Sequence, residues 1–493
     1  MADLLTDSLL IANGEGALRL KVETSLIDLP LDSILQIPDT TIGKSISLPI
    51  PLNNVQPGTE IFPLTDITQY DLGDLALKRV VLRTGKLRLK VKSVLATAVD
   101  FTYLIPVAHQ FGNPFETQQT VQAGSSSDTA IAEFEFNLSG YEIDLRGSNG
   151  GSFNTLETTY ILKTSETGQV VSIPANSPFF FIEYSFLDIL PEYGQGYFGQ
   201  QSTMAEDENS KIDVLDRITE GQMFLDSVTI GLKIINGVGA DARFLLSSLK
   251  SINTRSNTTV NLAHELVGNT LLLTRAQDPT GNAEDVVTSQ IEYELNNSNS
   301  NIKGFIENLP DQLGFNFNFD LNPLGNVSSG NDFFYYDKPF QALMDIDIPL
   351  RTTLTNLTLV DTLDWNLSET GVVESINSGS FTLVAKNGFP LEGIAELILL
   401  DENLQELDTL LVPSTITAPA LDGNNRVISA VESRILIPVP DKTSNVLPRT
   451  RKVHIKVRFN TANQSDLIEF YDTYGIDLKL IGNFNINFGP STL

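Results

Sequence analysis

The chain has 493 residues, with 61 acidic against 32 basic side chains, a formal net charge of -29 and no cysteine. A field of that sign repels phosphate backbones and anionic headgroups, so nucleic acid is not expected as a partner. The absence of cysteine excludes disulfides, thiol nucleophiles and thiolate metal sites. With 41% hydrophobic residues, the chain has the composition of a globular protein, and its length predicts two or three domains.

Apolar and polar residues alternate with a period of two along most of the chain, which predicts strands with one buried face. The clearest example is Lys86–Lys92, where Leu87, Leu89 and Val91 alternate with four basic residues. Those bases are expected to pair with carboxylates on neighbouring strands. The predicted fold class is all-β, with antiparallel sandwich units and few short helices, for which 32–36, 302–309 and 466–474 are the candidates.

Two segments, 230–238 and 381–389, share alternating apolar residues that lead to an Asn-Gly pair, and each is followed by a second apolar run. Asn-Gly between two such runs predicts a β-hairpin turn with positive φ. A degenerate copy starts at Leu87, with Ser93 in place of the asparagine. The copies start 143 and 151 positions apart, which predicts an internal repeat of about 145 residues.

Composition breaks place the predicted units at 1–203, 204–345 and 346–493. Two alternatives stay open. The second and third units could share one core, and residues 1–54 could complete a sheet of a distant unit.

Chemistry-bearing residues are sparse. The three histidines (His109, His264 and His454) lack metal-ligand spacing, and no Gly-Lys-Ser/Thr phosphate loop is present. With 61 acidic residues, carboxylate pairs such as Asp345 and Asp347 arise by chance. We therefore expect no catalytic residue and no organic cofactor.

Two weak kinds of site remain. Oxygen-rich turns suit calcium, and the structural calcium candidates are Asp320, Asn322, Asn331 and Asp332. Exposed aromatic rings can stack on sugars, and the ligand-binding candidates are Tyr193, Tyr197, Tyr335, Tyr336 and Trp365. In both cases a solvated turn or a packed core is the ordinary alternative.

Five segments together resemble uncharacterised exported, lipoprotein-type β-rich proteins of Bacteroidota: 7–10, 70–73, 191–199, 296–301 and 387–390. The resemblance implies a signal segment with an acylated cysteine before residue 1, and hence a lipid tether and an envelope location. It carries no known activity.

No run of about 18 apolar residues is present, so no transmembrane segment is predicted. We expect a non-enzymatic structural or binding component of the bacterial cell envelope or surface, associated with the outer membrane or exposed, with an envelope protein or a glycan as partner. The alternatives are a carrier of lipid or another hydrophobic ligand, with an apolar groove between curved sheets, and a carbohydrate-binding or carbohydrate-active protein.

Overall fold

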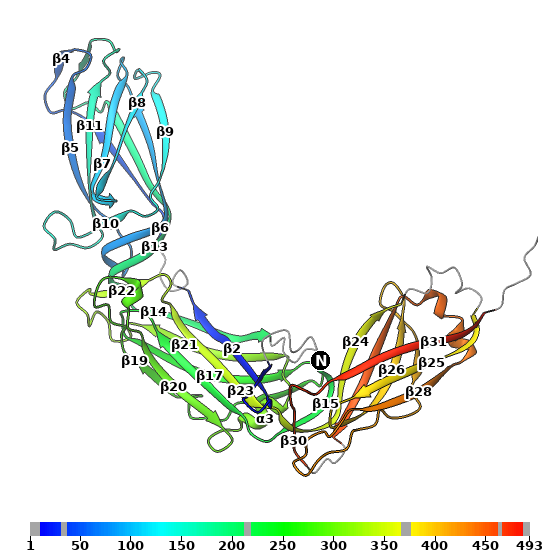
Figure 1. Cartoon of the computed structure of the whole chain (residues 1–493). Helices are drawn as coiled ribbons and strands as arrows, with labels where there is room; N and C mark the ends of the chain where they lie inside the picture. The colour runs from blue at the N-terminus through cyan, green and yellow to red at the C-terminus, as the bar shows by residue number, and fades with distance from the viewer. Residues whose placement is uncertain (1–9, 31–36, 212–217, 366–375, 462–465, 487–493) are drawn as a thin grey trace, which may run out of the picture.

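The chain folds into three β-sandwiches that form a bent, elongated molecule (Figure 1). The computed structural model describes residues 10–30, 37–211, 218–365, 376–461 and 466–486. Antiparallel strands make up nearly all of its regular structure, and the predicted all-β sandwich fold is confirmed. We name the sandwiches distal, central and C-terminal, in their order along the molecule.

The distal sandwich is built from one continuous part of the chain. Its strands are β3 (Thr40–Ile46), β4 (Leu52–Val55), β5 (Glu60–Gln69), β6 (Ala76–Ser93), β7 (Val99–Gln110), β8 (Asn113–Val121), β9 (Ala130–Asn137), β10 (Glu142–Asp144), β11 (Thr155–Thr164), β12 (Val171–Ile173) and β13 (Phe180–Tyr197). One sheet has the order β3-β13-β6-β9 and faces the order β5-β11-β7-β8. Numbered by chain order, the eight main strands run 1-8-3-6 over 2-7-4-5, which is a jelly roll.

The central sandwich has the same strand order. Its first strands precede the distal sandwich in the sequence, and its other strands follow it. Its elements are β1 (Leu10–Ala12), β2 (Leu18–Leu29), β14 (Gln201–Lys211), β16 (Thr229–Asn236), β17 (Ala242–Asn253), β18 (Thr258–Asn261), β19 (Thr270–Leu273), η2 (Ala283–Asp285), β20 (Ser289–Asn296), α3 (Ile302–Glu307), β21 (Gln312–Leu321), β22 (Asp332–Tyr335) and β23 (Phe340–Pro349). Its sheets are β2-β23-β16-β20 and β14-β21-β17, with β18 and β19 both on β17. The whole distal sandwich is therefore inserted between β2 and β14.

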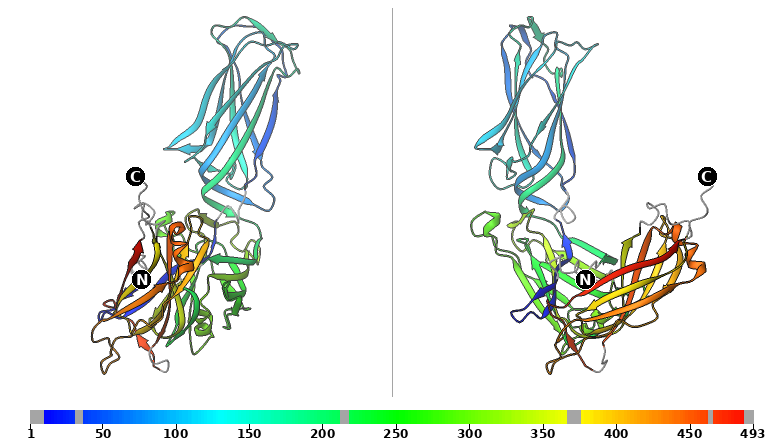
Figure 2. Two further views of the ribbon diagram at one scale, coloured as in Figure 1. Left: turned by 90° about the vertical axis from the view of Figure 1, so that its right-hand side faces the viewer. Right: turned by 45° about the vertical axis from the view of Figure 1, so that its right-hand side comes forward.

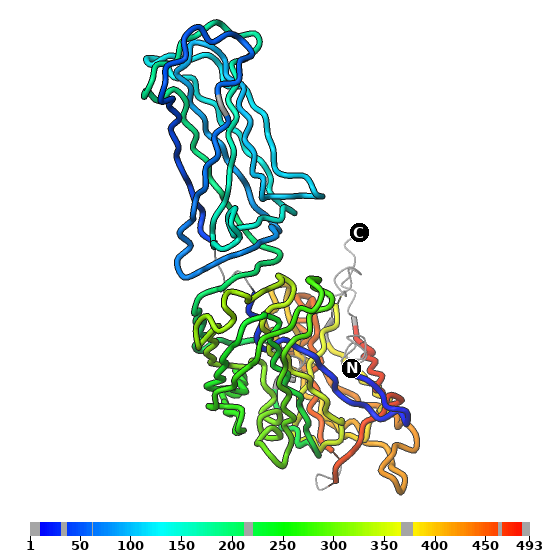
Figure 3. The backbone as a smooth tube through the Cα atoms, turned by 90° about the vertical axis from the view of Figure 1, so that its left-hand side faces the viewer, coloured from blue at the N-terminus to red at the C-terminus, as the bar shows by residue number. Residues whose placement is uncertain are grey.

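The register of β2 shows this long-range closure directly. β2 pairs antiparallel with β23, and Arg19 Nε donates to Asp347 Oδ1 at 2.7 Å across 328 positions. Figure 3 shows the blue β2 segment running along the green central strands toward the distal sandwich. The first strand of the central jelly roll thus comes from the start of the described chain.

The C-terminal sandwich has one narrow and one wide sheet. Its elements are β15 (Ile218–Leu225), β24 (Arg351–Asp364), β25 (Ile376–Asn387), β26 (Leu391–Leu400), β27 (Glu406–Leu411), β28 (Val431–Val439), α4 (Asp441–Ser444), η5 (Leu447–Arg449), β29 (Lys452–Thr461), β30 (Ile468–Glu469) and β31 (Ile476–Ile486). The wide sheet has the order β15-β24-β29-β26-β27, with β30 on β24, and the narrow sheet is β28-β25-β31. Strand β15 reaches it from the central part of the chain.

The predicted hairpins at the two Asn-Gly pairs are wrong. Strand β16 pairs with β20 and β23, whereas β17 lies in the opposite sheet, and β25 and β26 are divided in the same way. Each pair lies at a corner where the chain crosses between sheets, and the φ angles of Gly237 and Gly388 are not positive. The asparagine side chain, rather than the backbone freedom of the glycine, fixes this corner.

The two asparagines make matching hydrogen bonds and are fully buried. Asn236 Nδ2 donates to the carbonyl oxygens of Ala240 at 2.9 Å and Thr274 at 3.0 Å, while its Oδ1 accepts from the Val238 N–H at 3.0 Å. In the C-terminal sandwich, Asn387 contacts the corresponding atoms of Leu391, Thr417 and Phe389 at 2.7, 3.0 and 3.0 Å.

The degenerate copy occupies the same corner of the distal sandwich. Buried Ser93 Oγ accepts from the N–H of Leu95, two residues on, at 3.2 Å. A serine reaches only this local partner, so one hydrogen bond replaces three. All three aligned segments therefore hold the same place in their sandwiches.

Strand β6 shows why alternation positions the core. Leu87, Leu89 and Val91 are fully buried, and the alternate residues face outward. The predicted pairing of the basic face is confirmed for Lys86 and Arg88, which contact carboxylates on β9 and at Asp188. These surface ion pairs contribute about 1 kcal/mol or less each, so burial of the apolar row dominates.

Of the two predicted helices that fall within the described residues, 302–309 corresponds to α3. The prediction at 466–474 is wrong, because its described residues form β30 and a turn, with Tyr471 bridged to Ala17. The segment 32–36 lies outside the described residues.

Candidate functional site

The distal and central sandwiches meet at a joint that collects four of the five aromatic candidates. Strand β13 extends beyond the distal sandwich, and its residues 193–196 pair with β22. Tyr193 lies opposite Tyr335, with ring centroids 4.8 Å apart, and both side chains are buried. Each ring packs against protein rather than facing solvent. We call Tyr193, Tyr197, Tyr335 and Tyr336, together with Phe333 and Phe334, the joint cluster.

Two arginines of β6 cover tyrosine rings at the joint cluster. The Arg79 guanidinium lies 5.3 Å from the Tyr193 ring centroid, and that of Arg83 lies 4.1 Å from the Tyr336 centroid. The carboxylate partners are Glu142 at 2.6 Å for Arg79, and Glu192 at 3.0 Å and Asp337 at 3.3 Å for Arg83. Since Arg83 bonds carboxylates from both sandwiches, it links them directly.

Two tyrosines of the joint, Tyr335 and Tyr197, have a raised pKa. Burial raises the pKa of Tyr335, and the hydrogen bond that its hydroxyl donates to Asp278 Oδ2 at 2.8 Å raises that pKa further. Burial likewise raises the pKa of half-buried Tyr197, in the same strand as Tyr193. The Tyr335 hydroxyl therefore acts as a hydrogen-bond donor that ties Asp278 to the joint.

Trp365 lies apart from the other aromatic candidates, in the C-terminal sandwich directly after β24. Its ring meets Phe381 edge-on at a centroid distance of 5.3 Å. Its backbone N–H donates to the Arg451 carbonyl at 2.7 Å. The indole Nε1 is buried and has no hydrogen-bond partner among the described atoms.

The calcium candidates also lie near the joint, but their oxygens already have partners. Asp332 is buried, and its carboxylate accepts from Arg275 at 3.1 Å and from Asn322 Nδ2 at 2.9 Å. Asp320 pairs with Arg243 at 2.7 Å, and Asn331 Oδ1 accepts from a lysine Nζ. Guanidinium groups among the ligands do not match the oxygen shell that calcium takes.

No group of three or more His, Asp or Glu side chains suited to a metal ion occurs within the part of the chain that the structure describes. The observed chemistry is a buried group in which Asp332 is bonded to Arg275 and Asn322, with separate contacts at Asp320 and at exposed Asn331 nearer the surface. It ties β22 and the end of β21 to the joint.

The central sandwich contains an apolar cavity of about 250 Å³ between its two sheets. Its walls come from β2, β14, β21, β23 and α3 of the central sandwich and from β15 of the C-terminal sandwich. The apolar lining residues are Leu20, Val22, Leu26, Met223, Leu225, Ile306, Pro310, Leu313, Met344, Ile346, Ile348 and Leu350. Glu23, Ser25, Ser210 and Lys211 add a few polar groups, which is the usual composition of a site for an apolar ligand with a polar end.

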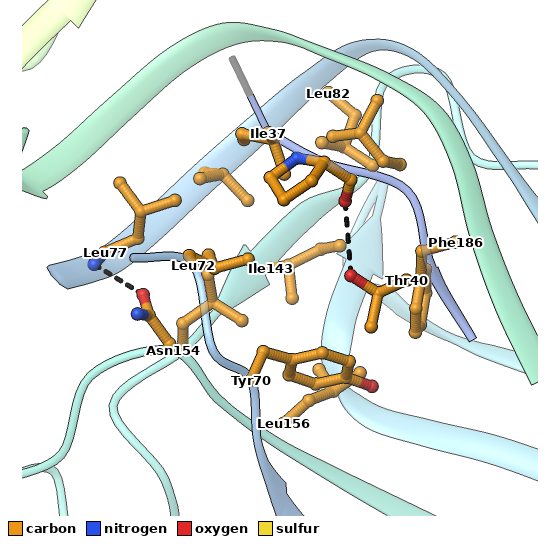
Figure 4. Close-up of a pocket in the computed structure, with 14 residues that line it drawn as sticks. Ile37, Thr40, Tyr70, Leu72, Leu77, Leu82, Ile143, Asn154, Leu156 and Phe186 are labelled. Atoms are coloured by element: carbon orange, nitrogen blue, oxygen red, sulfur yellow. Dashed lines mark hydrogen bonds between the residues drawn. The ribbon is translucent and has the colours of Figure 1, made fainter. Parts of the chain in front are cut away.

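A second, smaller cavity of about 80 Å³ lies in the distal sandwich (Figure 4). Figure 4 shows apolar side chains around it, with the Tyr70 ring below. Burial raises the pKa of Tyr70, whose buried hydroxyl lacks a hydrogen-bond partner among the described atoms. About 80 Å³ is too little for a drug-sized ligand.

Sequence reasoning missed the central cavity. Its walls come from strands as distant as β2 and β23, and each contributes an ordinary alternating row. No local pattern distinguishes a row that faces a cavity from one that faces a filled core.

Neither the protein-family models nor the curated proteins include a match to this chain. Among solved structures, the chain is similar to a presumed secreted protein from Parabacteroides distasonis, with a TM-score of 0.27 and 12% identity over 58% of this chain and 89% of that one. It is also similar to recombinant peptide:N-glycanase F, with a TM-score of 0.16 and 12% identity over 65% and 99%. Likenesses this low carry no functional argument. Within the described residues, no helix has the length and apolarity needed to cross a membrane.

Proposed function

We propose that this protein is a non-enzymatic structural component of a bacterial envelope or surface, a stiff spacer that holds the distal sandwich away from the C-terminal one. The observation that carries the proposal is the joint: β13 is shared between the two sandwiches, and their buried residues form one continuous hydrophobic cluster. A shared strand and core resist bending, whereas domains joined by linkers move freely.

The second joint supports the same function. β15 leaves the central part of the chain and pairs with β24, while Leu350 is the single residue between β23 and β24. Leu18 N–H donates to the Phe470 carbonyl at 2.8 Å, and Leu350 N–H donates to the Leu18 carbonyl at 2.9 Å. Three chain segments thus bind the C-terminal sandwich to its neighbour.

An envelope location with a lipid tether ahead of residue 1, and an envelope protein or glycan as partner, belong to this proposal. Labelling intact cells of the source organism with a membrane-impermeant reagent tests it. We expect the protein produced from its full-length precursor to be labelled on intact cells and to be recovered with the outer membrane. Recovery in the cytoplasmic fraction would contradict the location.

The non-enzymatic assignment and the carbohydrate alternative are tested together. The purified chain is incubated with a panel of glycans and polysaccharides and is also applied to a glycan array. We expect no released sugar. Glycan binding without hydrolysis would favour the carbohydrate-binding alternative, and hydrolysis would overturn the structural assignment.

A second candidate, a carrier of a hydrophobic ligand, is favoured by the central cavity. An apolar space of about 250 Å³ has room for a short acyl chain, with Lys211 or Ser210 near a polar end. Native mass spectrometry of the purified chain tests it, with co-purified lipid expected if it is a carrier. Ile346→Trp fills the cavity and should abolish that signal, whereas Ile67→Trp, on an exposed position of β5, should retain it.

The matching corners at Ser93, Asn236 and Asn387 support a further part of the proposal, that the three sandwiches descend from one duplicated unit. Repetition of a stiff jelly roll is a direct way to lengthen a spacer. The shared fold alone implies no shared ligand.

A further inference from the structure

Among the residues that the structure describes, the C-terminal sandwich has no counterpart of the strand that completes the other two. In the distal sandwich the last strand, β13, pairs with β6 on one side and with the first strand, β3, on the other. In the central sandwich the last strand, β23, pairs in the same way with β16 and β2. The equivalent strand, β31, pairs with β25, and no described strand pairs with its outer edge.

Inward-facing apolar side chains of β31 are exposed where the other two sandwiches have this neighbouring strand. Its inward-facing row starts with Ile476, Leu478 and Leu480, which lie opposite Asn387, Ala385 and Leu383 of β25. Leu478 is 36% exposed, while its equivalents, Ile182 on β13 and Ala342 on β23, are 1% and 2% exposed. Residues built to face a core are left partly in water.

The facing strand of the wide sheet is uncovered at the same place. Leu363, in the row of β24 that turns inward opposite Val453, is 40% exposed. The buried, unpartnered Nε1 of Trp365 lies beside this strip. An unpaired edge above an apolar strip is a template for an added strand.

The outward face of β31 indicates which strand fits. Its only two charged residues, Asp477 and Lys479, flank Leu478 and are exposed. When two copies of β31 run antiparallel with Leu478 opposite Leu478, Asp477 of each copy faces Lys479 of the other. Ile476 then faces Leu480 on the inner side, so both faces are complementary in one register.

We propose that β31 takes a second copy of itself as its missing neighbour, which makes the protein a symmetric dimer. The two narrow sheets join into one continuous six-stranded sheet, β28-β25-β31 followed by the same strands of the second copy in reverse order. An isologous pairing of this kind closes on itself. In this register it pairs 476–480, the part of β31 that carries the exposed Leu478, with the same residues of the second copy. Figure 2, left, shows β31 along a margin of the molecule, where a second copy has access.

The charge pattern permits a test that only this register passes. Lys479→Asp leaves four acidic residues at the contact, and Asp477→Lys leaves four basic ones, so each variant alone should dimerise about tenfold or more weakly. A mixture of the two should form a heterodimer, because each lysine then faces an aspartate. Arg434→Asp, an equal charge change on an exposed position of β28, the strand of the narrow sheet farthest from β31, is the matched control and should dimerise normally.

Sedimentation velocity of the full chain across a concentration series is the measurement. We expect a dimer for the unaltered chain and for Arg434→Asp, monomers for each single β31 variant, and dimers again on mixing. A chain that stays monomeric at all concentrations, with amide protons of β31 protected from exchange, would show that the chain fills its own edge and would overturn the proposal. Dimers that ignore both charge reversals would overturn it as well.

Discussion

At the scale of single residues, buried polar side chains determine where the chain turns from one sheet to the other. Asn236 and Asn387 each satisfy two backbone carbonyls and one N–H inside a core. Unsatisfied groups in such a place cost about 1–3 kcal/mol each. The asparagines are therefore structural anchors of their sandwiches.

The first prediction follows from the number of hydrogen bonds, which is three at Asn236 and at Asn387 but one at Ser93. Asn236→Ala or Asn387→Ala should lower the free energy of unfolding by about 2–4 kcal/mol, and Ser93→Ala by about 1 kcal/mol, since Ser93 makes one such bond. Urea denaturation checks both values. The exposed Asn403→Ala is the control, and equal effects at all four positions would contradict the anchor role.

The second prediction concerns alkaline pH. Burial raises the pKa of Tyr70, Tyr103 and Tyr160 in the distal sandwich, so the folded state keeps them neutral while the unfolded state ionises them near pH 10. Their contribution to stability is complete below about pH 10 and is lost as the pH rises toward the folded-state values. The free energy of unfolding should therefore fall above about pH 10.

Tyr103→Phe tests whether a buried tyrosine causes the loss of stability at alkaline pH. The Tyr103 hydroxyl is buried without a hydrogen-bond partner among the described atoms, so its removal should leave stability at pH 7 unchanged or higher and should reduce the alkaline slope. Denaturation at several pH values, with tyrosinate absorbance as a second signal, measures both. An unaltered slope in Tyr103→Phe would show that this tyrosine does not contribute.

At the scale of elements, the joint strand β22 connects two sandwiches through four residues. Phe334 is fully buried and packs on Phe198 with ring centroids 5.0 Å apart. Gly194 lies against it, so that a Cβ there would come within 2.5 Å of the Phe334 ring. β22 is thus fitted to β13 by close packing.

The third prediction is that Phe334→Ala loosens this joint. Loss of a buried phenylalanine should cost about 3–5 kcal/mol, and amide exchange should increase at 193–197 and 332–335 while β7 and β26 stay protected. Hydrogen exchange with mass spectrometry measures this by segment. Uniform exchange throughout the chain would instead indicate global unfolding.

The strands themselves were largely predictable, because alternation is a local signal that burial enforces, as in Leu87, Leu89 and Val91. The direction of the chain after each strand was not. Asn-Gly favours a hairpin turn, but at residues 236 and 387 the asparagine side chain bonds to distant carbonyls that no local pattern discloses. The pairing of Arg19 with Asp347 lies equally beyond a local signal.

In the sequence, the aromatic candidates stand out one by one, and as candidates for stacking on sugars rather than as parts of a joint. In the sequence, Tyr193 and Tyr335 are candidates for stacking on a ligand, with a packed core as the alternative, and the structure places them against each other in a joint. Their meeting depends on the insertion of the distal sandwich between β2 and β14. Likewise, no feature of Asp332 in the sequence indicates that Arg275 neutralises it.

At the scale of the whole molecule, nested connections produce one long body. The distal sandwich is inserted in the central one. Strand β15 lies between β14 and β16 of the central sandwich in the sequence, but it pairs in the wide sheet of the C-terminal sandwich. Figures 1 and 2 show the three sandwiches extended around a bend. Stiffness at both joints is the property on which the spacer function depends.

Because the chain has no cysteine, spin labels can be attached wherever cysteine is introduced, and the distances between them test this stiffness most directly. Labels at Glu116 and Glu265 span the first joint, and labels at Glu265 and Glu402 span the second. Double electron–electron resonance should give one narrow distance distribution for each pair, and Phe334→Ala should broaden only the first. Broad distributions for both pairs in the unaltered chain would contradict a stiff spacer.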